Sequence, residues 1–307
     1  MLKLLYMENY DFQSSFQKDT LQAYVSRSLG KALRLVSAEQ FAVSTRSAPW
    51  HIVAASDSGT SDFVLRLGKN IGQREVSVMQ ALAHIPEIPT PCVFGWEPDG
   101  RTFGVPCFLC DFIDGESLLR PLLEGEEWAA DLYLRAALQL NAITREQLSR
   151  LGCSLPASIS AMEELEDAYQ FFQSHPSVLV DEVYEQLVKQ IPYFHEACFS
   201  NGDLWLDNLL VKDKQLVGVI DFEQAGFSDP VHEFLLPFFN EPRLRGRGIE
   251  ERYCVALGLD PTCLRWYHGL EYYHALHYVE KSGEAFNQYS SDRLRTELEL
   301  WLATDRG

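Results

Sequence analysis

Asp203, Asn208 and Asp221 are polar residues whose types and spacing could perform phosphate chemistry. Asp203 and Asn208 lie five residues apart in the run SNGDLWLDNLL, and Asp221 follows two apolar segments that are separated by KDKQ. Two apolar segments around a polar turn predict a β-hairpin. Because the first residue of one strand and the last residue of its antiparallel partner lie at the same end, we expect Asn208 and Asp221 to be neighbours.

An amide oxygen beside a carboxylate is a typical partial ligand set for Mg²⁺, which leaves its other positions to water and phosphate. Asp203 precedes the hairpin in a loop, where it could meet a group that arrives opposite the metal-bound phosphate, so we interpret it as a general base. Asp and Asn also occur in turns for backbone reasons. The spacing alone therefore leaves open a purely structural hairpin with polar ends.

Three runs, NGDLWLDN, GVIDFEQAG and SDPVHEF, together resemble the aminoglycoside phosphotransferase family, small-molecule kinases that share the protein-kinase-like fold. The resemblance implies that Asp203 is the catalytic base and that Asn208 and Asp221 hold Mg²⁺. It also implies ATP or another nucleoside triphosphate as the phosphate donor. Asp229 is a typical N-cap before Pro230, and by the resemblance Asp229 and Glu233 brace the catalytic loop.

The nucleotide side of the predicted cleft contains a cation on a strand and an acid on the following helix. The strand DFVLRL carries Arg66, and Glu75 follows nine residues later. In kinase-like folds such a cation contacts the nucleotide phosphates and pairs with a helix glutamate. Lys69 is a competing cation, and an ordinary surface ion pair is the structural alternative. A phosphate-binding loop of the P-loop type is absent from the sequence.

Two further segments are expected to contact the nucleotide. Residues 44–52 contain no glycine, so the hydroxyl and backbone N–H groups of Ser44 and Thr45 are our candidates for covering the phosphates. The run CDFIDG resembles the hinge of the family, where backbone groups of Asp111 and Ile113 would face adenine.

The sequence departs from the family at Asn201, because the family usually has His-Gly-Asp where this chain has Asn-Gly-Asp. This departure and the missing glycine-rich loop leave open a second hypothesis, a kinase-like module that binds nucleotide or ligand without transfer. The run GDLW also resembles the ketosamine (fructosamine-type) kinases of the same superfamily, which is a further alternative.

The pattern along the chain predicts an α+β, protein-kinase-like fold of two lobes. Residues 33–67 alternate short apolar runs with turns, as in an antiparallel meander, and a helix follows near Glu75. DGESL at 114–118 reads as a turn and a helix start, and residues 117–190 are mainly helical. We place an N-terminal nucleotide-binding lobe at 1–112 and a helical lobe with the catalytic loop and acceptor site at 113–307.

The composition limits the possible partners. The 307 residues carry a net charge of −18, which disfavours nucleic acid and anionic membranes and suits a small-molecule acceptor, including a cationic one. Seven scattered cysteines are typical of reduced thiols, and the beginning of the sequence lacks the pattern of a signal peptide. We therefore expect a cytoplasmic protein, and the sequence leaves its oligomeric state open.

Aromatic residues near the C-terminus offer a candidate acceptor site. Trp266, Tyr267 and Tyr273 could surround an amine or stack on a sugar, although core positions of an amphipathic helix explain each of them more simply. His274 and His277 lie in the same segment without a carboxylate or third histidine at ligand spacing, so we interpret them as helix residues.

Overall fold

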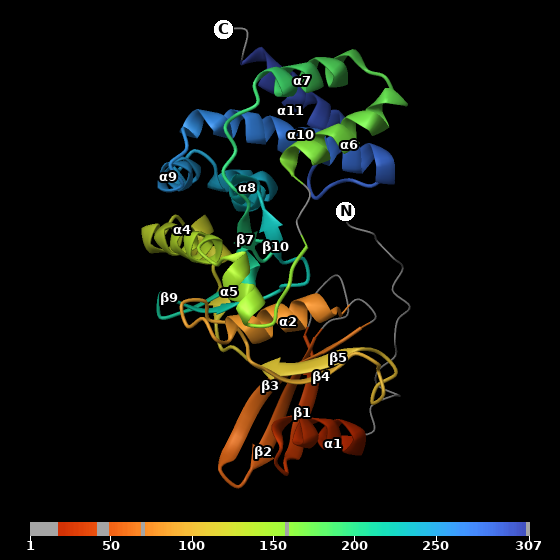
Figure 1. The fold of residues 1–307 in the computed structure, drawn as a ribbon, viewed down its shortest axis with the longest axis vertical. Helices are drawn as coiled ribbons and strands as arrows, with labels where there is room; N and C mark the ends of the chain where they lie inside the picture. Colours follow the sequence, from red (N-terminus) through yellow and green to blue (C-terminus); the bar gives the residue numbers. More distant parts are fainter. Residues whose placement is uncertain (1–17, 42–48, 69–70, 157–159, 305–307) are drawn as a thin grey trace.

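The computed structural model describes residues 18–41, 49–68, 71–156 and 160–304. Figure 1 shows two parts along the long axis, with an antiparallel sheet and two helices in the first and most of the helices in the second. The predicted α+β architecture, with a β-rich first part and a mainly helical second part, is thereby confirmed. The exact division at residue 112 stays a prediction.

The first part is a five-stranded antiparallel sheet in the order β1-β2-β3-β5-β4, which confirms the predicted meander. Its strands are β1 (Arg34–Gln40), β2 (Trp50–Ser56), β3 (Gly59–Leu67), β4 (Val93–Glu97) and β5 (Cys107–Asp111). Its helices are α1 (Lys18–Leu29) and α2 (Gln73–Leu82).

Strand β5 is buried on both faces, and each face belongs to a different hydrophobic core. Cys107 and Leu109 pack in a small core with side chains of α1 and β1–β3. Phe108 and Cys110 point the other way and join the large core, which contains α2 and the helices of the second part. This alternation follows from the two-residue period of a strand. Both cysteines of this strand are therefore buried packing residues.

The second part is built of helices around two small sheets. Its helices are α3 (Leu119–Leu123), α4 (Glu127–Asn141), α5 (Arg145–Arg150), α6 (Ala161–Gln173), α7 (Val178–Lys189), α8 (Pro230–Asn240), α9 (Ile249–Ala256), α10 (Leu264–Ser282) and α11 (Ser291–Ala303). Its strands are β6 (Glu116–Ser117), β7 (Cys198–Ser200), β8 (Leu209–Lys212), β9 (Gln215–Val219) and β10 (Gly226–Ser228). Short 3₁₀ turns are η1 (Leu206–Asn208), η2 (Pro242–Leu244) and η3 (Pro261–Cys263).

Local sequence explains where several of these helices begin. Ser160 caps α6 by accepting a hydrogen bond from the backbone of Glu163, whose side chain accepts one from the backbone of Ser160. Asp229 caps α8, and Pro230 occupies its first position as predicted. Leu165, Ala168 and Phe172 then form the buried face of α6, as expected for an amphipathic helix.

The segment that joins the two parts lies against the β8–β9 hairpin. Residues 116–117 were expected in a turn and a helix start, but they form the short strand β6, which pairs with β8 before α3 begins. A Cβ on Gly218 would lie 2.6 Å from Ile113 Cδ1, and one on Gly115 would lie 2.8 Å from Val217 Cγ2. The two glycines therefore allow the joining segment to lie close to the hairpin, a contact that local sequence preferences did not predict.

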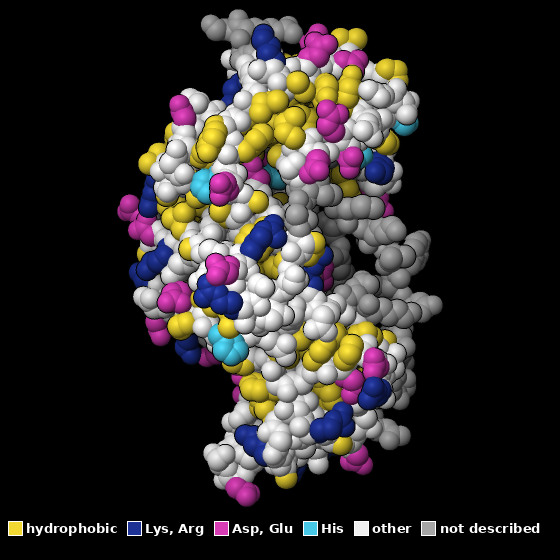
Figure 2. Space-filling view, viewed as in Figure 1, with side chains coloured by type: hydrophobic (Ala, Val, Ile, Leu, Met, Phe, Trp, Pro, Cys, Tyr) yellow, Lys and Arg dark blue, Asp and Glu magenta, His cyan; other side chains and the backbone are white. Residues whose placement is uncertain are grey.

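Among the described residues, no helix combines the length and apolar character needed to cross a membrane. Figure 2 shows acidic and basic side chains interspersed on the visible face, without a broad basic area among the residues described there.

Candidate active site

The β8–β9 hairpin brings Asn208 and Asp221 to the same end, as predicted. Leu209 pairs with Val219, and the backbone N–H of Ile220 donates to the carbonyl oxygen of Asn208 at 2.9 Å. Asp221 follows with a φ of 61°, a left-handed conformation that Asp adopts more readily than most residues. Its carboxylate oxygen Oδ1 is buried and has no hydrogen-bond partner among the described residues.

Asp203 lies beside Asn208. The amide nitrogen of Asn208 is 2.9 Å from the carbonyl oxygen of Asp203 and 3.3 Å from its Oδ2. Because the nitrogen of this amide is engaged by Asp203, its oxygen is the atom left for a cation. Burial and, after it, the negative charge of Asp221 raise the pKa of Asp203, the hydrogen bond from Asn208 opposes both, and the net result is a pKa of about 6.

The loop around Asp203 is held by a hydrogen bond from Asn201 and by close packing of Gly202 on Gln224. Asn201 is fully buried, and its amide nitrogen donates to the carbonyl oxygen of Asp203 at 2.9 Å. Gly202 has a φ of +78°, and a Cβ there would lie 2.2 Å from the carbonyl oxygen of Gln224. Asn201 and Asn208 therefore donate to the same backbone oxygen, which fixes the position of Asp203 from two sides.

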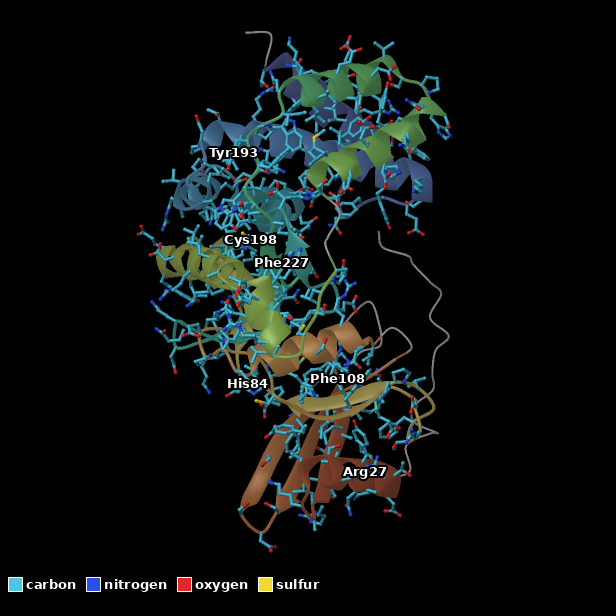
Figure 3. All side chains as sticks on the ribbon, viewed as in Figure 1. Arg27, His84, Phe108, Tyr193, Cys198 and Phe227 are labelled. Carbon is cyan, nitrogen blue, oxygen red and sulfur yellow. The ribbon has the colours of Figure 1, made fainter. Side chains whose placement is uncertain are left out.

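Glu233 braces this loop from α8. Its carboxylate accepts hydrogen bonds from Ser200 Oγ at 3.3 Å and Ser228 Oγ at 3.0 Å, and Ser200 Oγ accepts one from the N–H of Gly202 at 3.1 Å. Ser200 and Ser228 lie on β7 and β10, which pair antiparallel; Figure 3 labels their neighbours Cys198 and Phe227 on the same two strands. Burial raises the pKa of Glu233.

Asp229 supports the same helix at its start. One carboxylate oxygen accepts hydrogen bonds from the backbone N–H groups of Val231 and His232, and the other accepts one from Tyr267 at 2.7 Å. The bracing role expected for Asp229 and Glu233 is thus matched by contacts, although nothing in the sequence indicated the serine partners.

Arg66 and Glu75 form an ion pair between β3 and α2, and Arg66 also reaches the hairpin. Its guanidinium nitrogens lie 3.9 Å from Asp221 Oδ1 and 3.9 Å from Glu223 Oε2. The guanidinium carbon is 5.7 Å from the centre of the Phe108 ring, which lies where β5 meets α2 (Figure 3). Arg66 therefore connects the sheet to the carboxylates of the second part.

Glu75 is only 1 % exposed, and its Oε2 has no hydrogen-bond partner among the described residues. Burial raises the pKa of Glu75, the Arg66 charge opposes this shift, Asp221 and Glu223 add to it, and the net result is a pKa of about 7. Three carboxyl groups therefore surround one guanidinium, and a bound cation would reduce the repulsion between their negative charges.

The other residues that were predicted to contact the nucleotide are only partly described by the structure. Ser44, Thr45 and the alternative cation Lys69 lie outside the described residues. The N–H of Asp111 donates to the carbonyl oxygen of Cys92 at 3.1 Å, and the carbonyl oxygen of Ile113 accepts from Gly115 at 3.1 Å. These two backbone groups are thus engaged within the protein, and their contact with adenine stays a prediction.

The C-terminal aromatic candidates are core residues. Trp266, Tyr267 and Tyr273 are buried, and Trp266 donates its indole N–H to the carbonyl oxygen of Leu187 at 2.8 Å. The simpler interpretation, an aromatic helix core, therefore holds. Sequence reasoning missed the approach of Glu164 to His232 and His274, because these residues come from three separate helices.

The family comparison decides the identity of the fold. Residues 51–267, more than half of the chain, match the model of the phosphotransferase enzyme family (APH). The chain belongs to this family. The resemblance that the motifs indicated is thereby confirmed, and the protein is an enzyme of the phosphotransferase class. No curated protein sequence matches this phosphotransferase.

Solved structures share the fold of this phosphotransferase at low sequence identity. A thermostable mutant of aminoglycoside phosphotransferase APH(4)-Ia, in a ternary complex with ADP and hygromycin B, is 14% identical with a TM-score of 0.66, covering 94% of this chain and 99% of that one. The macrolide 2′-phosphotransferase MphH from Brachybacterium faecium is 15% identical with a TM-score of 0.61, covering 92% and 98%. The GDP and kanamycin complex of APH(2″)-IIIa is 16% identical with a TM-score of 0.60, covering 93% and 98%.

Proposed function

We propose that this phosphotransferase moves the γ-phosphoryl group of ATP, or of another nucleoside triphosphate, to a hydroxyl group of a small molecule. The observation that carries the proposal is the convergence of Asp203, Asn208 and Asp221 at one end of a hairpin that Arg66 also reaches. Two of the similar structures are complexes with ADP and hygromycin B or with GDP and kanamycin, which supports a nucleotide donor and a small-molecule acceptor here. The acidic chain is compatible with a cationic acceptor.

The donor set fits Mg²⁺. Asp221 Oδ1 is a buried carboxylate oxygen without a hydrogen-bond partner among the described residues, and the oxygen of Asn208 points away from its engaged nitrogen. Both are the hard oxygen donors that Mg²⁺ prefers. When bound there, Mg²⁺ would neutralise phosphate charge during transfer. Asn208 and Asp221 would hold the metal, and Arg66 would contribute further positive charge to the phosphates.

Asp203 would act on the acceptor. One carboxylate oxygen takes the proton of the acceptor hydroxyl as the hydroxyl oxygen bonds to the γ-phosphorus, while the bond from that phosphorus to the bridging oxygen breaks and ADP leaves. A pKa raised to about 6 suits this task, because a base near the working pH can both accept and release a proton. Asn201 and Asn208 keep the base in place during the reaction.

Seven free cysteines support placing this reaction in a reducing compartment, the cytoplasm. The identity of the acceptor is to be found by a transfer screen with γ-labelled ATP over aminoglycosides, amino sugars, ketosamines and choline-like amines.

The base assignment is tested by Asp203→Asn. We expect transfer to fall by about 10²–10⁴-fold, because the amide cannot take the proton. Asp213→Asn is the matched control, since Asp213 is exposed at the other end of the same hairpin and should leave the rate unchanged. Unchanged transfer in Asp203→Asn would show that another group is the base. Binding of ATP and Mg²⁺ in calorimetry without turnover on any acceptor would support the non-catalytic alternative instead.

A further inference from the structure

Three helices of the second part bring two histidines and a glutamate together. α10 packs against both α6 and α8 (Figure 1). Glu164 comes from α6, His232 from α8 and His274 from α10, and each offers one ligand atom within 4.8 Å of the other two. Glu164 Oε2 lies 3.4 Å from His232 Nδ1 and 3.7 Å from His274 Nδ1.

These spacings suit a shared ion better than a direct hydrogen bond. A bond between nitrogen and oxygen is typically 2.7–3.2 Å, and both separations are longer. Tetrahedral ligands at the usual Zn–N and Zn–O distances stand about 3.3 Å apart from one another. The two separations that involve Glu164 are therefore close to the ligand spacing around a tetrahedral metal.

The cluster also holds a polar atom that the protein leaves unpaired. Glu164 Oε2, the oxygen that lies within 4 Å of both histidine rings, is buried and has no hydrogen-bond partner among the described residues. A buried polar atom without a partner loses hydration without compensation. An ion at the centre of the cluster would give Glu164 the partner that it lacks.

Glu271 provides the outer contact that a metal-binding histidine usually has. Its Oε1 lies 2.8 Å from His232 Nε2, the ring nitrogen remote from Glu164. Histidine ligands commonly donate their other N–H to a carboxylate, which fixes the tautomer and turns the free lone pair toward the metal. With Nε2–H donated to Glu271, His232 Nδ1 faces Glu164 as an acceptor.

We propose that Glu164, His232 and His274 form a binding site for a divalent transition-metal ion of the Zn²⁺ class, with Glu271 as the outer partner of His232. Two imidazoles and one carboxylate suit Zn²⁺ and Co²⁺ rather than Mg²⁺, which prefers oxygen ligands. Three protein ligands leave the fourth tetrahedral position for water or a ligand atom of a small molecule. This site is separate from the nucleotide metal and goes beyond the proposed function.

The site would link three helices next to the catalytic loop. His232 is followed directly by Glu233, whose carboxylate holds Ser200 and Ser228. An ion at the cluster would therefore fix the beginning of α8, where the loop is braced. The competing explanation is an ion pair in which a protonated His232 lies between Glu164 and Glu271, with no metal.

The test is direct metal binding by the full chain after treatment with a chelator. Titration with Co²⁺ should show one equivalent bound, with the intense visible absorption of a four-coordinate ion, and Zn²⁺ should displace it. His274→Gln and Glu164→Gln should each lose this absorption, and Glu271→Gln should weaken binding by about 10–100-fold. Circular dichroism of each variant establishes that it is folded, and Glu164→Gln serves if His274→Gln does not fold.

His277→Gln is the matched control, because His277 lies one turn further along α10 and outside the cluster, so it should bind like the wild type. Cys254 and Cys263, whose sulfurs are 3.8 Å apart, are an alternative Co²⁺ site. Binding there would give charge-transfer bands from sulfur to Co²⁺. Such bands, an absence of stoichiometric binding, or equal binding by His274→Gln and the wild type would each overturn the proposal. The readout is independent of phosphate transfer, so its failure would leave the proposed function untouched.

Discussion

Asp203 combines a raised pKa with two hydrogen bonds to its own carbonyl oxygen, and Asn208 acts on both the position and the pKa of this residue. Asn201 and Asn208 hold the backbone. Burial and the charge of Asp221 raise the pKa of the side chain. Substitution of Asn201 should therefore change mainly the geometry of the loop, whereas substitution of Asn208 should also raise the pKa of Asp203, because Asn208 donates to its carboxylate.

The pKa of Asp203 predicts the pH dependence of transfer. The base must be ionised, so kcat/KM should rise about tenfold per pH unit below an inflection at or below about pH 6 and level off above it. Mg²⁺ on Asp221 would lower the inflection, because it offsets one of the charges that raise the pKa of Asp203. The measurement is a pH–rate profile from about pH 4 to about pH 8, roughly two units on either side of pH 6. Asp213→Asn should show the same profile. A residual rate of Asp203→Asn that kept the same inflection would contradict the assignment.

Gly202 predicts a stability effect at the same loop. An alanine in a left-handed conformation costs about 1–2 kcal/mol. Gly202→Ala should destabilise the protein by more than this, because the added Cβ would also clash with the carbonyl oxygen of Gln224. Gly152→Ala is the control, since Gly152 has a φ of +79° with no atom within 4 Å of the added Cβ. Urea unfolding compares the two, and equal losses would show that the contact with Gln224 is relieved without cost.

At the scale of elements, β3 and α2 are joined by the Arg66–Glu75 pair, and the burial of Glu75 in this pair makes the free energy of unfolding sensitive to pH. Glu75 has a folded pKa of about 7 against an ordinary 4.5, so the folded protein holds a proton that the unfolded chain has lost between these values. The contribution of Glu75 is therefore most favourable below about pH 4.5 and is lost as the pH rises through about 7.

Between about pH 4.5 and about pH 7, we expect the free energy of unfolding of the wild type to fall by about 3 kcal/mol relative to that of Glu75→Gln. The reason is that each unit of pKa shift corresponds to about 1.4 kcal/mol. Urea unfolding at several pH values measures the difference. Glu87→Gln, a substitution of an exposed residue in the turn region after α2, should give a curve parallel to the wild type. A parallel curve for Glu75→Gln would mean that Glu75 is ionised throughout.

The sequence predicted the elements whose signals are local. The hairpin of Asn208 and Asp221 followed from two apolar runs and one turn, and the β1–β3 meander followed from alternation. The strand β6 was missed because its two residues pair only through contact with β8, which is distant in sequence.

The same limit applied to the candidate site. Arg66 and Glu75 could be paired from the resemblance to kinase-like folds, whereas the contact of Arg66 with Glu223 required the tertiary structure. The cluster of Glu164, His232 and His274 spans 110 positions of the chain, so no spacing rule could assemble it. Helix packing alone brings those residues together.

At the scale of the whole molecule, Arg66 links the sheet to the hairpin, so nucleotide binding should stabilise both parts together. ATP with Mg²⁺ at about 100 times its Kd should raise the free energy of unfolding by about 2.7 kcal/mol. Arg66→Gln should reduce this gain by about 1.4 kcal/mol for each tenfold loss of affinity.

Thermal or urea unfolding with and without nucleotide provides the measurement. Arg74→Gln is the control, because Arg74 is exposed on α2 and should keep the full gain. Equal stabilisation of Arg66→Gln and the wild type would remove Arg66 from the phosphate site.

Strand β5 has one face in each of the two hydrophobic cores, with Phe108 and Cys110 packed against the interior that α2 shares with the second part. A fragment of residues 1–112 would lose the packing partners of that face and leave it open to water. Unfolding of the intact chain should consequently be a single cooperative transition, in which the sheet and the helices are lost together. The part of this enzyme that contains the five-stranded sheet would then be an architectural unit that depends on its neighbour to fold.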